Sequence, residues 1–173
     1  KTYPSICMTN ELFPRIFKTR KINKRFGTFF GPYSHISSMY AVLELVEKLY
    51  KPRTCRFPIT KEGIEHGRYK PCLEYHIHKC NAPCIGKQSY EDYRENMLRA
   101  REILRGNTRG ISSLVYEEMQ KKASELKFEE AEELKKQYLL IENFCSKSEV
   151  VSHTITNVDV FTIVDDDNKR NAY

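Results

Sequence analysis

Residues 71–84 read PCLEYHIHKCNAPC, and with Cys55 they place four cysteines in a short span: Cys55, Cys72, Cys80 and Cys84. The intervals between them are sixteen, seven and three residues. The surrounding segment, residues 51–88, shows little hydrophobic periodicity and also holds four prolines and three glycines. A segment of that composition cannot bury a core of its own, so it needs a cross-link or a bound group, which the cysteines can supply.

The rest of the sequence indicates which kind of link this is. Clustered thiols form disulfides in oxidising compartments, whereas in reducing ones they are ligands for soft metals and iron–sulfur clusters. No signal-like apolar run opens the chain, no stretch of about 18 apolar residues occurs, and the mean hydropathy is negative. We therefore expect a cytoplasmic protein without a membrane span, in which these cysteines are metal ligands.

The spacing leaves three interpretations open, namely a [4Fe–4S] cluster, zinc, or no metal. Structural zinc sites commonly use paired CxxC knuckles, which are absent here, and the longer intervals suit a cluster wrapped by an irregular loop. Pro71 and Pro83 each precede a cysteine and stiffen the chain, which lowers the entropy lost on ligation. His66, His76 and His78 lie nearby, but four thiolates already complete a site.

Positive charge is concentrated at the start of a chain whose net charge is +6. Eleven Lys or Arg and three acidic residues lie between Lys1 and Arg56. A basic patch with interleaved aromatic residues is typical of a nucleic-acid-binding surface, and the alternative is a solvated basic face without a partner. The predicted DNA contacts are Arg15, Lys18, Arg20, Lys21, Lys24 and Arg25. Of the aromatic residues, Phe29 and Phe30 are expected in the core.

Short apolar runs near the start predict a small antiparallel sheet. Residues 5–9 (SICMT) and 15–19 (RIFKT) flank turn residues at 10–14, which is the pattern of a β-hairpin. Residues 28–30 predict a third short strand. Apolar residues at helical spacing then predict a helix over residues 35–50, with Ser34 as its N-cap.

The second half of the sequence is predicted to be helical until its tail. Ser89 caps a helix that Gly106 ends, and a helical hairpin follows with arms at 111–125 and 128–144 joined at Lys127. From Val150 the period changes to two, which predicts a β-hairpin. The fold class is therefore α+β and mostly helical, with a short N-terminal β-hairpin, an irregular cysteine-rich loop region, an antiparallel helical hairpin and a C-terminal β-hairpin.

The order of several motifs resembles the UvrC family, a subunit of the bacterial excinuclease. The motifs are KTYPSI, FPRIFKTRK, FFGPYS, KLYKPRTC, KPCLEYHIHKCNAPC and LKFEEAEELK, and the resemblance covers essentially the whole chain. The interval between Cys55 and Cys72 is longer than usual in the family, although all four thiols are in place. The resemblance implies that these cysteines hold an iron–sulfur cluster.

The resemblance also implies a place in a longer protein that incises DNA on both sides of a lesion in nucleotide excision repair. Residues 1–50 would then include the end of a GIY-YIG nuclease domain, 51–106 the cysteine-rich region, 107–147 a UVR helical hairpin, and 148–173 the start of an RNase H-like domain. Both catalytic centres would lie outside this chain, so we expect it to be inactive and assign no catalytic residue. Asp165, Asp166 and Asp167 are interpreted as a turn.

The expected partners are UvrB, bound through the helical hairpin, and double-stranded damaged DNA. The predicted UvrB-binding residues are Met119, Leu126, Phe128, Ala131 and Leu134, with a rim formed by Glu129, Glu130, Glu132 and Glu133. In the alternative, this apolar stripe packs within the molecule on the helix at 89–105. Two further functions stay open: a stand-alone nucleic-acid-binding module stabilised by a metal or cluster, and a redox protein.

Overall fold

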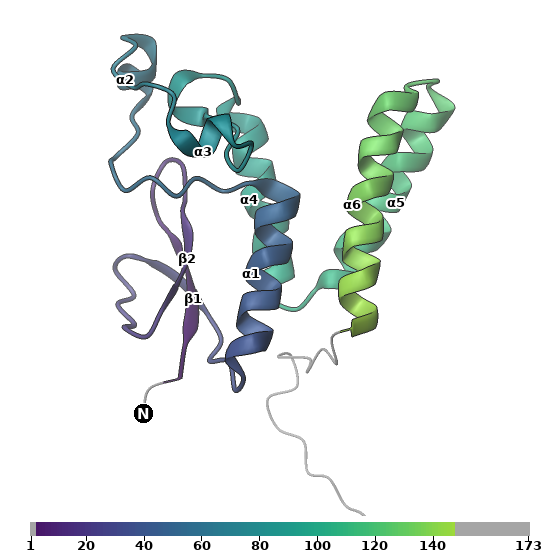
Figure 1. Ribbon diagram of the computed structural model, residues 1–173, viewed down its shortest axis with the longest axis horizontal. Helices are drawn as coiled ribbons and strands as arrows, with labels where there is room; N and C mark the ends of the chain where they lie inside the picture. Colours follow the sequence, from purple (N-terminus) through teal and green to yellow (C-terminus); the bar gives the residue numbers. More distant parts are fainter. Residues whose placement is uncertain (1–2, 148–173) are drawn as a thin grey trace, which may run out of the picture.

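A computed structural model describes residues 3–147 of the chain (Figure 1). A small sheet packs beside two helices, α1 and α4, and a pair of long helices, α5 and α6, lies on the far side of α1 and α4. One buried core runs from Ile6 in the sheet to Ile141 in the last helix. The predicted α+β class is confirmed, and the predicted C-terminal β-hairpin lies outside the described residues.

The sheet has three antiparallel strands, β1 Ser5–Thr9, β2 Ile16–Thr19 and β3 Gly27–Phe30, in the order β2-β1-β3. All five residues of the central β1 are buried. Met8 pairs with Ile16 on one edge and with Thr28 on the other, which fixes the register of the whole sheet. The predicted hairpin and third strand are therefore confirmed.

Helix α1 spans Ile36–Tyr50 and buries Met39, Val46 and Leu49, among others, as its period predicted. The prediction of Ser34 as N-cap is wrong. His35, with an extended backbone, occupies the cap position and makes no side-chain cap hydrogen bond, so Ser34 lies one residue outside the helix.

Helix α4 spans Tyr90–Leu104 and begins as predicted, because the Ser89 hydroxyl accepts a hydrogen bond from the Asp92 backbone N–H at 3.0 Å. Its predicted apolar stripe is entirely buried, and it ends before Gly106, whose φ is +90°. The stripe consists of Tyr93, Met97, Ala100, Ile103 and Leu104.

Between α1 and α4 the cysteine-rich segment contains only short turns of helix. These are α2 Lys61–Glu65, α3 Leu73–His76 and the 3₁₀ turn η1 Pro83–Ile85. The irregular path predicted for this segment is confirmed, because no element in it exceeds five residues.

The helical hairpin is formed by α5 Thr108–Ser124 and α6 Phe128–Lys147. Helix α5 begins three residues before the predicted start because the Asn107 side chain accepts a hydrogen bond from the Gly110 N–H at 3.2 Å. The end of the hairpin that is remote from its turn joins the common core through Ile111, Val115 and Ile141. None of the helices in residues 3–147 is long and apolar enough to cross a membrane.

Candidate functional site

The irregular segment between α1 and α4 carries the four predicted ligand cysteines. Cys80 and Cys84 are buried, Cys55 is half-buried and Cys72 is exposed at the start of α3, and all four are free thiols. Burial raises the pKa of the Cys80 thiol, the Ala82 backbone lowers it through a hydrogen bond, and the neighbouring Cys55, Cys72 and Cys84 thiols raise it further. The thiols are therefore electrostatic neighbours although they are distant in sequence.

Burial also raises the pKa of Cys84, and the thiols of Cys55 and Cys72 add to that rise. Within residues 3–147, no three His, Cys, Asp or Glu side chains are arranged to hold a metal ion. The four thiols are therefore not at ligand geometry in this structure. In donor chemistry the set fits a thiolate-bound metal group, and because the thiols must ionise to bind, binding would release protons.

A buried arginine, Arg53, contacts this cluster and was not singled out by the sequence. Its side chain is 1% exposed, and its guanidinium Nη1 donates to the Cys55 Sγ at 3.4 Å and to the Cys55 carbonyl oxygen at 2.9 Å. It also donates to the carbonyl oxygens of Phe57, at 2.8 Å, and Phe13, at 2.7 Å, and it is ion-paired with Glu11. Its positive charge lowers the pKa of Cys84, against the larger effect of burial.

Glu11 connects this arginine to the β1–β2 hairpin. Its carboxylate also accepts two hydrogen bonds from Arg15, at 2.8 and 3.1 Å. Partial burial acts to raise the pKa of Glu11, but the Arg15 hydrogen bond and the charges of Arg53 and Arg15 together hold it below its ordinary value. The cysteine-rich segment is therefore joined to the sheet by a partly buried network of charge-paired hydrogen bonds.

The structure divides the six residues predicted to contact DNA into two groups. Arg15 is ion-paired with Glu11, and Lys18 lies over the Tyr40 ring at 4.6 Å, so both have partners within the molecule. The other four lie on the exposed loop between β2 and β3 and, within the described part of the chain, form no ion pair. They are Arg20, Lys21, Lys24 and Arg25.

Two apolar side chains, Ile22 and Phe26, are also exposed on that loop. Of the two aromatic residues expected in the core, Phe30 is buried and Phe29 is half-buried. The prediction is therefore confirmed fully for Phe30 and partly for Phe29. The loop therefore presents four cations interleaved with two apolar side chains. The sequence pattern alone could not distinguish these four cations from Arg15 and Lys18, which have partners within the molecule.

The predicted UvrB-binding residues are likewise divided, by their position along the helical hairpin. Leu126 and Phe128, at the turn, are 73% and 66% exposed. Met119 and Leu134 are half-buried, and Ala131 is buried between the helices. Of the predicted rim, Glu130 pairs with Lys122 across the hairpin at 2.6 Å.

The alternative, in which the hairpin packs on the helix at 89–105, holds for one end of it. Arg99 of α4 forms a bidentate ion pair with Glu118 of α5, with N···O distances of 2.6 and 2.9 Å. Helix α6 contacts α1 at the same end. The turn, with Leu126 and Phe128, remains uncovered by the described chain.

Comparison with known proteins gives consistent results. A family model for the middle domain of UvrC/Cho excinucleases matches residues 3–103. The chain is 58% identical over 167 residues to UvrABC system protein C of Bacteroides thetaiotaomicron, and 43% identical over 173 residues to that of Porphyromonas gingivalis. These matches cover 96% and 100% of this chain but 27% and 28% of the relatives, so the chain spans about a quarter of their length. No solved structure gives a significant match.

Proposed function

Since the chain belongs to the UvrC/Cho excinuclease family, as its motifs predicted, we propose that it is the central linker and recruitment region of an excinuclease subunit in nucleotide excision repair. In this role it binds UvrB and DNA so that damaged DNA is incised on both sides of the lesion. The chain itself performs no incision. The observation that carries the proposal is the exposed apolar turn of the helical hairpin.

Leu126 is the most informative residue of that turn. Its φ is +61°, a left-handed conformation that costs a non-glycine residue about 1 kcal/mol, and its side chain is largely exposed. Neither backbone conformation nor packing within the described chain favours leucine at this position. Such an outlier suggests a function, and an exposed leucine beside an exposed phenylalanine suits the apolar surface of a partner helix pair.

The partner proposed here is the matching helical hairpin of UvrB. The test compares Phe128→Ala with Leu139→Ala, since both side chains are exposed on α6 but only Phe128 is at the turn. In calorimetric titration with a UvrB hairpin peptide, we expect Phe128→Ala to weaken binding about tenfold or more and Leu139→Ala to leave it unchanged. Equal affinities for wild type and Phe128→Ala would refute the proposed contact.

We also propose that the loop carrying Arg20, Lys21, Lys24 and Arg25 binds the DNA backbone. The test is the double variant Lys21→Glu/Arg25→Glu, with Arg109→Glu/Lys121→Glu on α5 as a control of equal charge change. With duplex DNA we expect the slope of log K against log salt to fall by about two for the loop variant only. An unchanged slope would exclude this loop as the DNA-binding surface.

The four cysteines are proposed to hold a [4Fe–4S] cluster, with zinc or no metal as the alternatives. Their intervals lack the zinc knuckle, and the Arg53 N–H···Sγ contact with Cys55 is of the kind that tunes cluster potentials. When bound, such a cluster would supply a cross-link and a redox-active centre. Cys55, Cys72, Cys80 and Cys84 would be its ligands.

Purification without oxygen, followed by visible spectroscopy and measurement of iron, sulfide and zinc, tests this assignment. We expect about four irons per chain, lost in Cys80→Ser and retained in the control Cys145→Ser. One zinc per chain would make the site a structural zinc site. A folded chain with neither metal would exclude both the cluster and zinc.

A second candidate function is a stand-alone nucleic-acid-binding module stabilised by its metal. The unpaired cations of the loop favour it, because they need no partner protein to contact DNA. DNA binding without any affinity for the UvrB hairpin would support this alternative over the recruitment role.

A further inference from the structure

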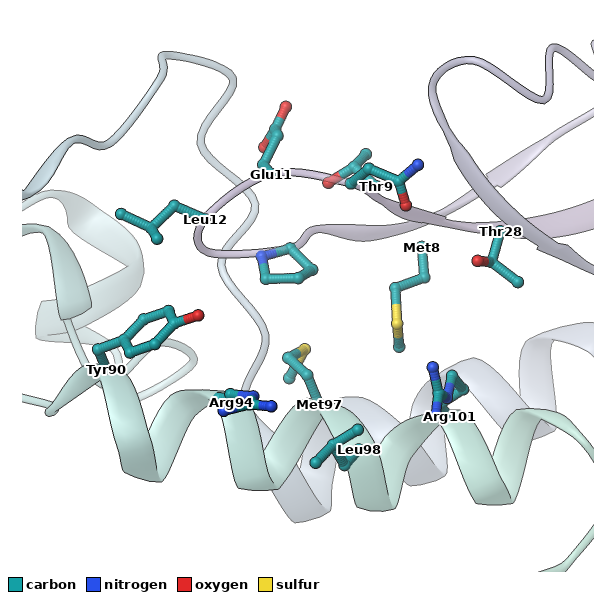
Figure 2. Close-up of a pocket in the computed structure, with 12 residues that line it drawn as sticks. Met8, Thr9, Glu11, Leu12, Thr28, Tyr90, Arg94, Met97, Leu98 and Arg101 are labelled. Atoms are coloured by element: carbon teal, nitrogen blue, oxygen red, sulfur yellow. The ribbon is translucent and has the colours of Figure 1, made fainter.

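A groove lies between the β1–β2 hairpin and helix α4, with a cavity volume of about 310 Å³ (Figure 2). We call it the hairpin–α4 groove, and the residues that matter here are Met8, Thr9, Thr28, Arg94, Met97 and Arg101. Figure 2 shows Met8 pointing from the sheet towards α4, and Met97 and Arg101 pointing from α4 towards the sheet. The groove therefore has an apolar floor and a basic wall.

The arginines of α4 differ in whether they have a charged partner. Arg99 is paired with Glu95 and Glu118, and Arg105 is paired with Glu102. Arg94 and Arg101 line the groove, and neither forms an ion pair within residues 3–147. Being seven residues apart, they lie on the same side of the helix, about 10 Å apart along its axis. The helix thus leaves unpaired the two arginines that face the groove.

Arg101 provides a second, independent observation. Its Nε is buried and has no hydrogen-bond partner within the described chain. A buried N–H donor without an acceptor is costly, and for a charged group the cost is larger. An acceptor bound in the groove would remove that cost.

The carboxylate nearest to the groove does not serve as this acceptor. Glu11 contributes to the lining, but Figure 2 shows its side chain turned away from α4. Its carboxylate is held by Arg15 and Arg53 instead. The electrostatic character of the groove is therefore set by Arg94 and Arg101, which favour an anion.

We propose that the hairpin–α4 groove binds a nucleotide of an unpaired DNA strand. A backbone phosphate accepts hydrogen bonds from Arg94 and Arg101, and the sugar or base lies on the apolar floor formed by Met8 and Met97. Thr28 adds a hydroxyl group at the sheet side, whereas the Thr9 hydroxyl already accepts a hydrogen bond from the Arg15 backbone N–H at 2.9 Å. This inference rests on the proposed DNA-binding function. It adds to the basic loop a second DNA-binding site, which takes the displaced or unstacked strand.

The size and position of the groove favour an unpaired strand. A volume of about 310 Å³ is at the low end for small-ligand sites, which suits a single nucleotide rather than a base pair. The end of the basic loop lies at the edge of the groove, because the backbone N–H of Asn10, a lining residue, donates to the Phe26 carbonyl oxygen at 3.0 Å. A strand crossing the loop would therefore reach the groove directly.

The test measures binding of a short oligothymidine and of a duplex to the 173-residue chain by fluorescence anisotropy over a range of salt concentrations. The variants are Arg94→Gln, Arg101→Gln and Arg101→Lys, with Arg109→Gln as the control of equal charge change on α5. For each Gln variant in the groove, we expect the salt slope for the oligothymidine to fall by about 0.7 and the affinity to fall about fivefold at 0.1 M salt. Arg101→Lys should keep most of the slope, and Arg109→Gln all of it.

Each other result decides against the groove in a recognisable way. If Arg94→Gln, whose side chain is exposed, leaves oligothymidine binding unchanged while Lys21→Glu/Arg25→Glu weakens duplex binding, the groove proposal fails and the DNA-binding function stands. If neither DNA binds the wild-type chain, both fail. If poly-glutamate binds the wild-type chain and this binding is lost in Arg94→Gln, while oligothymidine binding is unaffected, the groove binds an acidic peptide instead. Thermal melting checks that Arg101→Gln is folded.

Discussion

The hydroxyl of Tyr93 accepts a hydrogen bond from the backbone N–H of Arg53 at 3.0 Å. The same hydroxyl donates to the Pro14 carbonyl oxygen at 2.6 Å. Tyr93 is fully buried on α4, Pro14 belongs to the β1–β2 hairpin, and Arg53 lies near the start of the cysteine-rich segment. One phenol group therefore joins three parts of the chain that lie as many as 79 residues apart.

Tyr93→Phe tests this junction. Removing the hydroxyl leaves the buried Arg53 N–H and the partly buried Pro14 carbonyl without this partner, so we expect a loss of about 1–3 kcal/mol in the free energy of unfolding. Tyr116→Phe, on the exposed surface of α5, should change it by less than about 0.5 kcal/mol. Denaturant titration measures the free energy of unfolding of both variants. Equal losses in the two variants would show that the Tyr93 hydrogen bonds add nothing to stability.

Arg53→Met should be more damaging, because it removes the donors to three carbonyl oxygens and the charge that faces Glu11. We expect a loss of about 3–5 kcal/mol in stability and faster amide exchange over residues 54–59. Arg56→Met, at an exposed position three residues along, is the matched control and should have almost no effect. Unchanged exchange in Arg53→Met would show that the segment is held by other contacts.

Glu11 gives the fold a specific dependence on acid. Its pKa in the folded chain lies below its ordinary value of 4.5, so its contribution to stability is present above about that pH and is lost as pH falls through the lowered pKa. The stability difference between wild type and Glu11→Gln should therefore be constant near neutral pH and shrink below pH 4.5. Unfolding at several pH values measures this difference, and a gap that widened in acid would contradict the assignment.

Leu126→Gly is expected to act in opposite directions on stability and on binding. Glycine relieves the left-handed backbone at φ +61°, so the fold should gain up to about 1 kcal/mol, while the affinity for the UvrB hairpin should fall. The opposite signs exclude unfolding as the cause of weaker binding. Thermal melting and calorimetry on the same sample provide the comparison, and a variant that is both more stable and equally tight would remove Leu126 from the interface.

Local sequence rules predicted most of the elements correctly because each depends on neighbours in the chain. The Ser89 cap and the stripe of α4 follow from spacings of three and four residues, and both are confirmed. The cap of α1 was predicted one residue early, because serine is the better capping residue whereas the observed cap, His35, makes no side-chain cap hydrogen bond that a sequence rule could have anticipated. The prediction that Cys55, Cys72, Cys80 and Cys84 share one metal group came from their chemistry and spacing, and it stays a prediction, because within residues 3–147 no three such side chains are arranged to hold a metal ion.

Motifs and local periodicity were enough to identify the family, the three strands and the long helices, because each of these depends on residues that are close in the chain. Which charges are neutralised within the molecule could be read only from the folded chain. It paired Arg15 and Arg53 with Glu11, and within residues 3–147 it left Arg94, Arg101 and the loop cations without an ion pair. The physical reason is that an arginine's role depends on which carboxylate or carbonyl lies within about 3 Å of it, and those partners come from segments tens of residues away.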